Sequence, residues 1–329
     1  MVESERYGRY VSFLLGGVLL IAAPLIAASS CETRDSAMEE TRRISGGGAG
    51  NDTTTTVAGA MTDDGDEAVD TSGDAKEANK ALNVEGGVAS SLRDDARVVF
   101  LHHSTGQNIW DGGVEDWFHR YNSKQGKRYH VEERVYPTEE YGWKNYPFDY
   151  WNIWINNSGP RPYRGQDTLE ILTKSYDVIV WKHCFPVSDV GEATTGDITS
   201  ERRNLPSYRL QYAALRDKMR GFPNVRFLLW TGAARVRGET QPNLAKNAQS
   251  FFRWVKTDWD EPGDNIFLFD FYQLETEGGL YLLDRHAQGA DDSHPNEAFS
   301  KRVAPLFAQR VVDVIEGRGD ASGNLTGQR

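Results

Sequence analysis

Cysteine is scarce in this chain, and one long segment has no aromatic residue. The 329 residues include two cysteines, Cys31 and Cys184. That number excludes the disulfide framework of small secreted domains, so a folded domain here must be stabilised by a hydrophobic core. Although 11% of the chain is aromatic, residues 32–96 contain no Phe, Trp or Tyr. Such a segment buries too little apolar surface to offset chain entropy, and globular structure is expected only after it.

An excess of positive charge is also missing. The formal net charge is −11, and residues 32–96 account for most of it, with 15 Asp/Glu against 6 Lys/Arg. The acidity therefore belongs to a Gly-, Thr- and Asp-rich linker, which we expect to be disordered and extended by self-repulsion. The remaining chain is almost balanced in charge. This distribution disfavours nucleic acid as a partner and says little about the charge of a substrate.

Residues 1–31 have the parts of a secretory signal. Arg6 and Arg9 precede an apolar run at 11–28, and small residues lead to Cys31. This order of basic, apolar and small residues is typical of an exported protein. An alternative is ordinary cleavage near Ala28. Another is an uncleaved membrane anchor, since the apolar run approaches the length of a membrane span.

The end of this segment, Ser29-Ser30-Cys31, resembles a bacterial lipobox. The resemblance implies that Cys31 is lipidated and becomes the mature N-terminus. The linker would then tether a folded domain to the cell membrane or outer membrane, facing the periplasm or the exterior.

After residue 97, short β-prone runs alternate with helix-compatible ones. This alternation predicts an α/β domain with a mostly parallel sheet covered on both faces. In the last predicted helix Pro305 predicts a kink or two successive helices. Residues 141–163 break the alternation as a long loop rich in aromatic rings. The predicted strands are 98–101, 129–136, 177–181, 225–230 and 266–271, and the predicted helices are 114–121, 168–174, 208–220, 244–257 and 297–316.

Residues 97–113 indicate a buried strand and a tight loop, and a helix is predicted to follow at 114–121. Ser104 follows the strand directly, at the edge where open α/β sheets place ligands and reacting groups. A serine at such a position is usually a helix cap. A nucleophilic serine needs an imidazole to accept its proton and a carboxylate to orient that imidazole. Asp291 and His294 supply both, from a Gly- and Asp-rich loop just before the last helix.

A strand that ends in serine, five alternating strands and a late Asp-x-x-His-Pro resemble the SGNH (GDSL-like) hydrolase superfamily. The resemblance covers residues 97–317 and leaves 318–329 as a disordered tail. It implies a flavodoxin-like three-layer α/β/α sandwich with a five-stranded, mostly parallel sheet, and a serine hydrolase that acts on ester bonds without a cofactor. It makes Ser104 the nucleophile, His294 the general base and Asp291 its orienting acid. The family's Gly-Asp-Ser is here His102-His103-Ser104.

The oxyanion hole of that family is only partly matched. The resemblance implies that the backbone N–H of Ser104 is one donor. Gly142 is the nearest counterpart of a glycine that donates its own N–H. The family's Gly-x-Asn-Asp block is absent after the third strand, where Lys182 and His183 stand instead. Either one of these takes over as donor, or the hole is built differently, or the activity is lost.

Two other interpretations stay open. The chain is alternatively a glycan-binding cell-envelope lipoprotein without catalysis. A less favoured alternative is a metal-dependent hydrolase, in which His102 or His103 joins His183, His294 and Asp291 or Asp292. Neighbouring residues of an extended segment point to opposite sides, so only one of the first two histidines would face the cleft. We favour no metal, and we expect Cys184 to be a small buried hydrophobe.

The aromatic loop suggests the substrate. Rings such as Trp143 and Trp151, mixed with Asn, Gly and Tyr, form stacking surfaces for sugars. The alternative is that the rings hold a long insertion against the domain. Together these features predict an exported, lipid-anchored serine esterase that removes O-acetyl or other acyl groups from a carbohydrate.

Overall fold

The computed structural model describes residues 90–320 and 323–328, except residue 145. These residues lie within one compact unit, Asp70–Arg329. The signal segment, the lipidation site Cys31 and the linker up to residue 89 lie outside the described residues. Among the described residues, no helix is long and apolar enough to cross a membrane.

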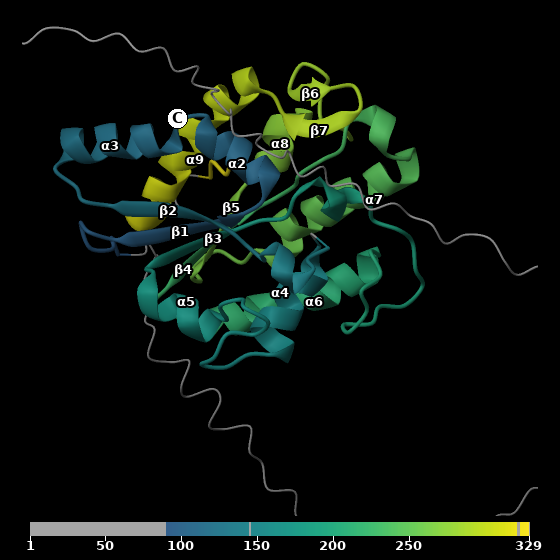
Figure 1. Cartoon of the computed structure of the whole chain (residues 1–329), viewed down its shortest axis with the longest axis horizontal. Helices are drawn as coiled ribbons and strands as arrows, with labels where there is room; N and C mark the ends of the chain where they lie inside the picture. Colours follow the sequence, from purple (N-terminus) through teal and green to yellow (C-terminus); the bar gives the residue numbers. More distant parts are fainter. Residues whose placement is uncertain (1–89, 145, 321–322, 329) are drawn as a thin grey trace, which may run out of the picture. The chain divides into compact units, whose positions relative to one another are not determined.

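Five parallel strands form the central sheet, and each lies on a segment that the sequence predicts as a strand (Figure 1). Their order is β2-β1-β3-β4-β5, the flavodoxin-like order. The fifth strand is shorter than predicted, because Phe271 already belongs to the next helix. The strands are β1 Arg97–His102, β2 His130–Val135, β3 Val178–Trp181, β4 Arg226–Trp230 and β5 Ile266–Phe269.

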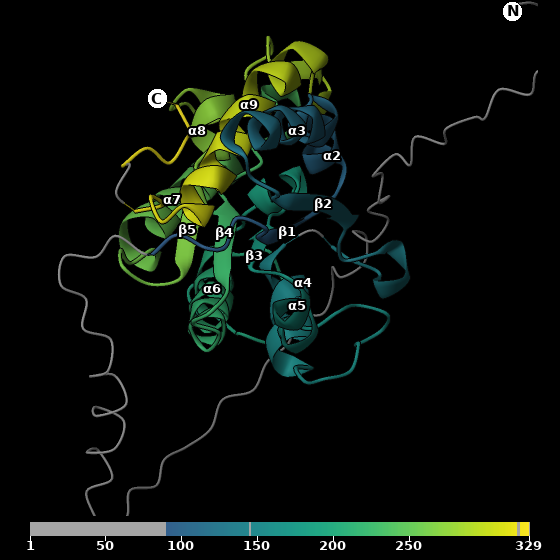
Figure 2. The ribbon, with the colours of Figure 1, turned by 90° about the vertical axis from the view of Figure 1, so that its left-hand side faces the viewer.

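Helices cover both faces of the sheet, which gives the predicted three-layer α/β/α sandwich (Figure 2). Successive strand residues face opposite layers. Val98 and Phe100 pack toward one layer, and Val99 and Leu101 pack toward the other. The first layer holds α2 Ser104–Asp111, α3 Val114–Gln125 and α9 Glu297–Ile315, and the second holds α4 Pro147–Trp151, α5 Leu169–Ser175, α6 Leu205–Arg220 and α7 Pro242–Trp254.

Short elements complete the chain. A short α-helix, α8 Phe271–Thr276, follows β5, and β6 Ala287–Gly289 pairs antiparallel with β7 Asp292–Pro295. The 3-10 turns are η2 Glu139–Tyr141, η4 Phe185–Ser188 and η5 Arg237–Glu239, and the π-helical turns are η3 Asn152–Asn156 and η6 Val255–Trp259.

The aromatic segment 141–163 is not one long loop, as the sequence suggests. It contains η2, α4 and η3, and most of its rings are buried in the core. Trp154 is fully buried, and its indole N–H donates to the hydroxyl of Tyr136, which closely follows β2, at 2.6 Å. Buried indoles need such a partner. These contacts hold the segment against the sheet.

Helix α9 is one continuous helix of 19 residues with Pro305 inside it, and the two successive helices considered from the sequence do not form. Its apolar face is buried on the sheet, from Phe299 and Val303 to Phe307 and Val311. Pro305 has no N–H to donate, so one helical hydrogen bond is missing. The packing of the apolar face compensates for this loss and keeps the helix continuous.

Both ends of the described chain contact the domain. Leu92, in the predicted linker, donates its backbone N–H to the carbonyl of Ile315 at 2.8 Å. Leu325, in the tail predicted as disordered, accepts from the backbone N–H of Asp270 at 2.8 Å and packs against the core. The boundaries predicted at 97 and 317 are therefore too narrow, because backbone hydrogen bonds and an apolar side chain extend the domain on both sides.

Candidate active site

The turn between β1 and α2 presents Ser104. His103 is extended, and Ser104 is the first residue of α2, so the loop predicted here is a helix. A Cβ at Gly106 would lie 2.4 Å from the Cβ of His102. Only glycine allows α2 to fold back so closely over the end of β1. The turn leaves the Ser104 side chain exposed at the carboxyl edge of the sheet.

The β6–β7 hairpin presents the candidate acid and the candidate base. Asp292 and His294 are two residues apart in β7, so their side chains share one face of the strand. Ser293 points the other way into the protein, where its buried hydroxyl accepts the backbone N–H of Val236 at 3.1 Å. That bond anchors the hairpin behind the site.

Three side chains meet in a line. The Nε2 of His294 lies 2.8 Å from the Oγ of Ser104, and its Nδ1 lies 2.6 Å from the Oδ1 of Asp292. The same Oδ1 accepts the backbone N–H of His294 at 2.9 Å. The carboxylate thus fixes the ring and favours a proton on Nδ1, which leaves Nε2 to accept the proton of the serine. The His294 side chain is 23% exposed, so the ring is accessible from solvent.

The sequence analysis predicts Asp291 as the orienting acid, and the structure shows that this prediction is wrong. The carboxylate that meets His294 belongs to its neighbour Asp292, and the side chain of Asp291 is exposed. The prediction assumed a loop, in which a three-residue spacing brings side chains together. The segment is a strand, and a strand brings together residues two apart. The pairing of Ser104 with His294 is as predicted.

An aromatic ring supports the imidazole. Phe185, the first residue of η4, packs edge-on against His294 with 5.0 Å between ring centroids. The guanidinium of Arg235 lies 4.9 Å from the centroid of the Phe185 ring. The sequence analysis missed Phe185, because nothing in a lone phenylalanine after a strand signals contact with a residue more than a hundred positions away.

Besides Ser104, the sequence offers three candidates for the oxyanion hole, and the structure places them in different surroundings. The N–H of Gly142 already donates to the carbonyl of Glu139 at 2.9 Å, which closes its own turn. Lys182 is buried, and its Nζ donates to the Sγ of Cys184 at 3.2 Å. His183 is buried among rings, with Tyr150 and Trp181 edge-on to it. Among the described residues, the side-chain contacts of Ser104 Oγ are with His294 and Cys184, and not with any of these three candidates.

Burial also sets the charge of His183. It lowers the pKa of His183 well below its usual value, so the ring is neutral. Among the described residues neither ring nitrogen has a hydrogen-bond partner. The backbone N–H of Ser104 itself remains as a donor, because the first N–H groups of a helix have no acceptor within the helix.

The four histidines considered as metal ligands lie in different surroundings. His102 contacts Glu133 with 2.9 Å between Nε2 and Oε2. His103 donates from Nε2 to the carbonyl of Pro137 at 2.5 Å and stacks on Trp143, with centroids 3.9 Å apart. Burial lowers the pKa of His103 to about 3. In the described part of the chain, no three His, Cys, Asp or Glu side chains are grouped as a metal site would require.

The two tryptophans proposed as sugar platforms differ. Trp143 is partly exposed and stacks on His103, the residue before the serine. Trp151 is 6% exposed and packs on Phe148, with centroids 5.6 Å apart. Trp151 is therefore a core residue, and Trp143 alone of the pair is partly exposed next to a residue that adjoins Ser104.

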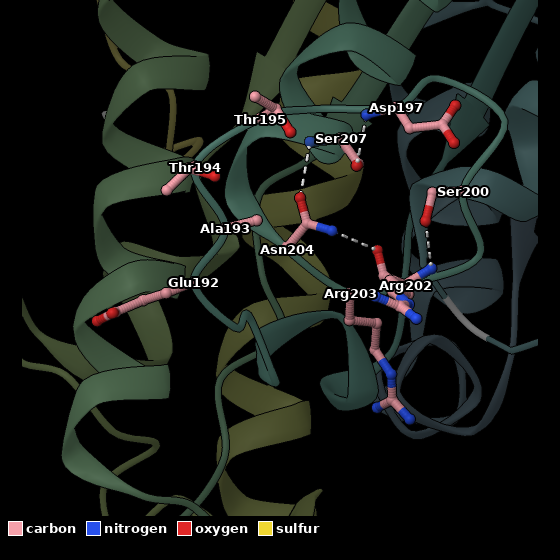
Figure 3. A pocket seen from close by; sticks show the side chains of 10 residues that line it. All are labelled: Glu192, Ala193, Thr194, Thr195, Asp197, Ser200, Arg202, Arg203, Asn204 and Ser207. Atoms are coloured by element: carbon pink, nitrogen blue, oxygen red, sulfur yellow. Dashed lines mark hydrogen bonds between the residues drawn. The ribbon is translucent and has the colours of Figure 1, made fainter. Parts of the chain in front are cut away.

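A polar pocket of about 660 Å³ lies in the segment between η4 and α6 (Figure 3). Asn204 caps α6 here by accepting the backbone N–H of Ser207 at 3.0 Å. Arg203 of the pocket lies 3.0 Å from Asp189, and Arg235 lies 2.7 Å from the same carboxylate oxygen. These ion pairs connect the pocket to Arg235, which lies over Phe185. The pocket lining comprises Glu192, Ala193, Thr194, Thr195, Asp197, Ser200, Arg202, Arg203, Asn204 and Ser207.

Comparison with known proteins gives likeness of structure only. No family model matches the chain, and no curated protein matches it. An acetyl xylan esterase is 16% identical over 64% of this chain and 98% of its own, with a TM-score of 0.39. A gut microbial diltiazem-metabolizing enzyme is 15% identical over 67% of this chain and 48% of its own, with a TM-score of 0.41.

A third solved structure, an α/β hydrolase enzyme from the metagenome of Lake Arreo, Spain, is 12% identical. It matches 70% of this chain and 99% of its own, with a TM-score of 0.42.

Proposed function

We propose that this chain is a serine hydrolase of carboxylic esters, with Ser104 as nucleophile, His294 as general base and Asp292 as the acid that orients it. The observation that carries the proposal is the continuous line from carboxylate to imidazole to hydroxyl, with 2.6 and 2.8 Å between successive atoms. Serine alone is a weak nucleophile, and this arrangement is what activates it.

In the proposed reaction, Ser104 Oγ attacks the ester carbonyl carbon while His294 Nε2 takes the hydroxyl proton. The tetrahedral intermediate then loses the alcohol, which receives that proton from His294, and leaves an acyl-serine. Water next attacks the acyl carbon, and His294 accepts a proton from the water. Collapse of the second intermediate releases the acid and returns the proton to Ser104. The side chains named here suffice for these steps without a cofactor.

We infer membership of the SGNH superfamily from three features. The strand order is flavodoxin-like, Ser104 follows β1, and His294 lies just before the last helix. The chain departs from the family where Lys182, His183 and Cys184 replace the asparagine block, and in using an acid two residues before the histidine.

An acylated carbohydrate is the proposed substrate, and removal of O-acetyl groups the proposed reaction. Trp143 is partly exposed and stacks on His103, the residue that precedes the nucleophile. Sugars stack on such faces through their C–H groups and need polar partners at their rims. The polar pocket near Arg203 supplies donors and acceptors of that kind.

We further propose that the domain is exported and held at a membrane by lipid on Cys31, with no role in nucleic-acid binding. The support is the signal-like segment 1–31 and its lipobox-like end. Metabolic labelling with a fatty-acid analogue tests it. Label in the full chain that is absent from Cys31→Ser is the expected result, and equal labelling of both chains contradicts it.

Hydrolysis of a chromogenic acetyl ester tests the proposed chemistry. The Ser104→Ala chain should lose turnover and should no longer react with a fluorophosphonate probe, which labels activated serines. Ser123→Ala is the matched control, because Ser123 is exposed on α3, away from the triad. Turnover that survives in Ser104→Ala, or a wild-type chain that neither turns over nor labels, would refute the proposal. The second result would favour a non-catalytic binding protein.

A further inference from the structure

Arg235 is a largely buried arginine whose contacts lead to the candidate base. Its guanidinium lies 4.9 Å from the centroid of the Phe185 ring, and that ring packs against His294 with 5.0 Å between centroids. The Arg235 side chain is 16% exposed. An arginine withdrawn from water needs partners for its charge, and the steps of ester hydrolysis proposed above do not use it. Its contacts indicate what it contributes.

A second set of contacts leads from Arg235 to the strand that carries the base. The Nη1 of Arg235 lies 3.5 Å from the Oε2 of Glu239, and the same oxygen accepts a hydrogen bond from the hydroxyl of Ser293. Ser293 directly precedes His294 in β7, and its side chain faces the other way. Arg235 is therefore linked to His294 twice, through the Phe185 ring and through the backbone of the strand.

Asp189 fixes the guanidinium. The Nη2 of Arg235 donates to the Oδ2 of Asp189 at 2.7 Å, and the Nη1 of Arg203 donates to the same oxygen at 3.0 Å. Asp189 directly follows η4, which begins with Phe185. The guanidinium thus connects the segment after β3 to the segment after β4, where the β6–β7 hairpin is anchored. Arginine suits this position because its planar fork presents several donors in fixed directions.

The imidazole of His294 has to satisfy two contacts at once. Its Nδ1 lies 2.6 Å from the carboxylate of Asp292 while its Nε2 lies 2.8 Å from the hydroxyl of Ser104. These two hydrogen bonds fix the ring along one line, and only neighbouring groups limit its rotation about that line. The Phe185 ring is such a neighbour, with 88° between the two ring planes, a favourable geometry for aromatic rings.

We propose that Arg235 is a positioning residue for the general base. It holds the Phe185 ring against the imidazole of His294 and, through Glu239, fixes the strand on which His294 lies. The inference rests on the ester hydrolysis proposed above. Arg235 acts through its neighbours, on the orientation of the ring that takes the serine proton. Without it, Phe185 loses the cation that packs on its ring, and Glu239 loses its counter-charge.

Arg235→Met tests this role through kcat and KM for the chromogenic acetyl ester and through the rate of fluorophosphonate labelling. Methionine keeps an unbranched apolar side chain and removes the charged fork. Both kcat and the labelling rate should fall by about 10- to 100-fold with KM within about 2-fold of wild type, because the base is misplaced and ester binding is unaffected. Wild-type kcat and labelling, or a rise in KM alone, would overturn the inference.

Arg220→Met is the matched control. Arg220 is also partly buried and also contacts two carboxylates, those of Glu261 and Asp264, at 2.8 and 2.7 Å. It ends α6 shortly before β4 begins, so it lies at the edge of the sheet opposite to Ser104. Arg220→Met should lower stability and leave kcat and labelling of the folded protein unchanged. An equal loss of kcat in Arg220→Met and Arg235→Met would overturn the inference, because general loosening of the fold would then explain both.

Two further variants test the route of the effect. Phe185→Leu removes the ring from His294. If Arg235 acts through that ring, the loss of kcat in Phe185→Leu/Arg235→Met should be smaller than the product of the two single losses. Glu239→Gln keeps an acceptor for Ser293 and removes the counter-charge of Arg235, so it should lower kcat less than Arg235→Met does and leave KM unchanged.

These variants also decide the matter if Arg235→Met does not fold. Wild-type kcat in either Phe185→Leu or Glu239→Gln would then overturn the inference, and a loss in both supports it. In folded double variants, a loss equal to the full product would overturn it as well.

Failure of this inference differs from failure of the proposed function. Loss of turnover in Ser104→Ala with wild-type kcat and labelling in Arg235→Met would leave ester hydrolysis standing and remove only the positioning role. A wild-type chain that neither turns over the ester nor reacts with the probe would refute both.

Discussion

His294 and His103 lie at the same edge of the sheet in different surroundings. His294 is partly exposed, with a carboxylate on one ring nitrogen and a hydroxyl on the other. His103 is buried, stacked on Trp143 and bonded to a backbone carbonyl, and burial lowers its pKa to about 3. A base needs access to its proton donor and a partner that stabilises the charged ring.

The comparison shows that position at a strand end does not by itself make a histidine catalytic. His102, His103 and His183 all follow or end strands at this edge, as an active-site residue would. Each has surroundings unlike those of His294: His102 contacts a carboxylate, His103 stacks on a ring, and His183 is fully buried. The only one of these four rings bonded to both a carboxylate and a hydroxyl is His294.

The largest effect expected from this comparison is that of His294→Ala. The change should lower kcat by about 10,000-fold or more, because a serine without its base reacts hardly better than a hydroxyl in solution. His183→Phe is the matched control, a fully buried ring that should lower stability and leave the reaction of folded protein intact. Burst and steady-state kinetics on the acetyl ester measure both. Near-normal kcat in His294→Ala would mean that another group is the base.

The two adjacent aspartates give the next largest effect. Asp292→Asn should lower kcat by roughly 100- to 10,000-fold, since an amide favours the wrong tautomer of the imidazole. Asp291→Asn should leave kcat as it is, because its exposed carboxylate is not the one bonded to His294. The two variants lie at adjacent positions, and each removes one negative charge. An equal loss in both variants would contradict the strand geometry.

The sequence predicts the five strands and the pairing of Ser104 with His294, because hydrophobic runs and strand ends are local signals. The sequence analysis assigns the acid to Asp291, three residues before His294, as suits a loop. The segment is a strand of the β6–β7 hairpin, in which the residue two positions before His294, Asp292, lies on the same face. The alternation in Asp292-Ser293-His294 was the available signal, with a small residue between two functional ones. It was outweighed by the Gly and Asp residues around it, which favour a loop.

The contact between Cys184 and Ser104 could not be predicted from the sequence, for a different reason. It follows from the pairing of Leu101 with Trp181, and register depends on which strands become neighbours. The sequence of each strand does not show that β1 lies between β2 and β3. The helical content of the aromatic segment was missed similarly, since its rings are buried through contacts with α6 and the sheet.

A smaller effect concerns the pH dependence of stability. The folded pKa of His103, about 3, lies below the usual value of 6.5, so the unfolded chain binds the proton first as pH falls. The stability linked to His103 is complete above pH 6.5 and decreases toward pH 3. It amounts to on the order of a few kcal/mol.

Urea unfolding at pH 7 and pH 4.5 measures this effect. The loss of stability between the two pH values should be smaller in His103→Phe than in wild type. His119→Phe is the control, because His119 is exposed on α3 and should leave the loss unchanged. Equal losses in wild type and His103→Phe would show that the buried ring does not resist protonation.

The smallest effect expected is on substrate affinity. It tests the role of Trp143, the ring on which His103 stacks. Trp143→Ala should raise KM by about 10-fold for an acetylated oligosaccharide and leave KM for a small acetyl ester nearly unchanged, because only the larger substrate reaches the ring face. Trp151 has no such face, being buried against Phe148. Trp151→Phe should therefore reduce stability without separating the two substrates. An equal rise in KM for both substrates in Trp143→Ala would show that the ring supports His103 and the turn at Ser104, and that the carbohydrate binds elsewhere.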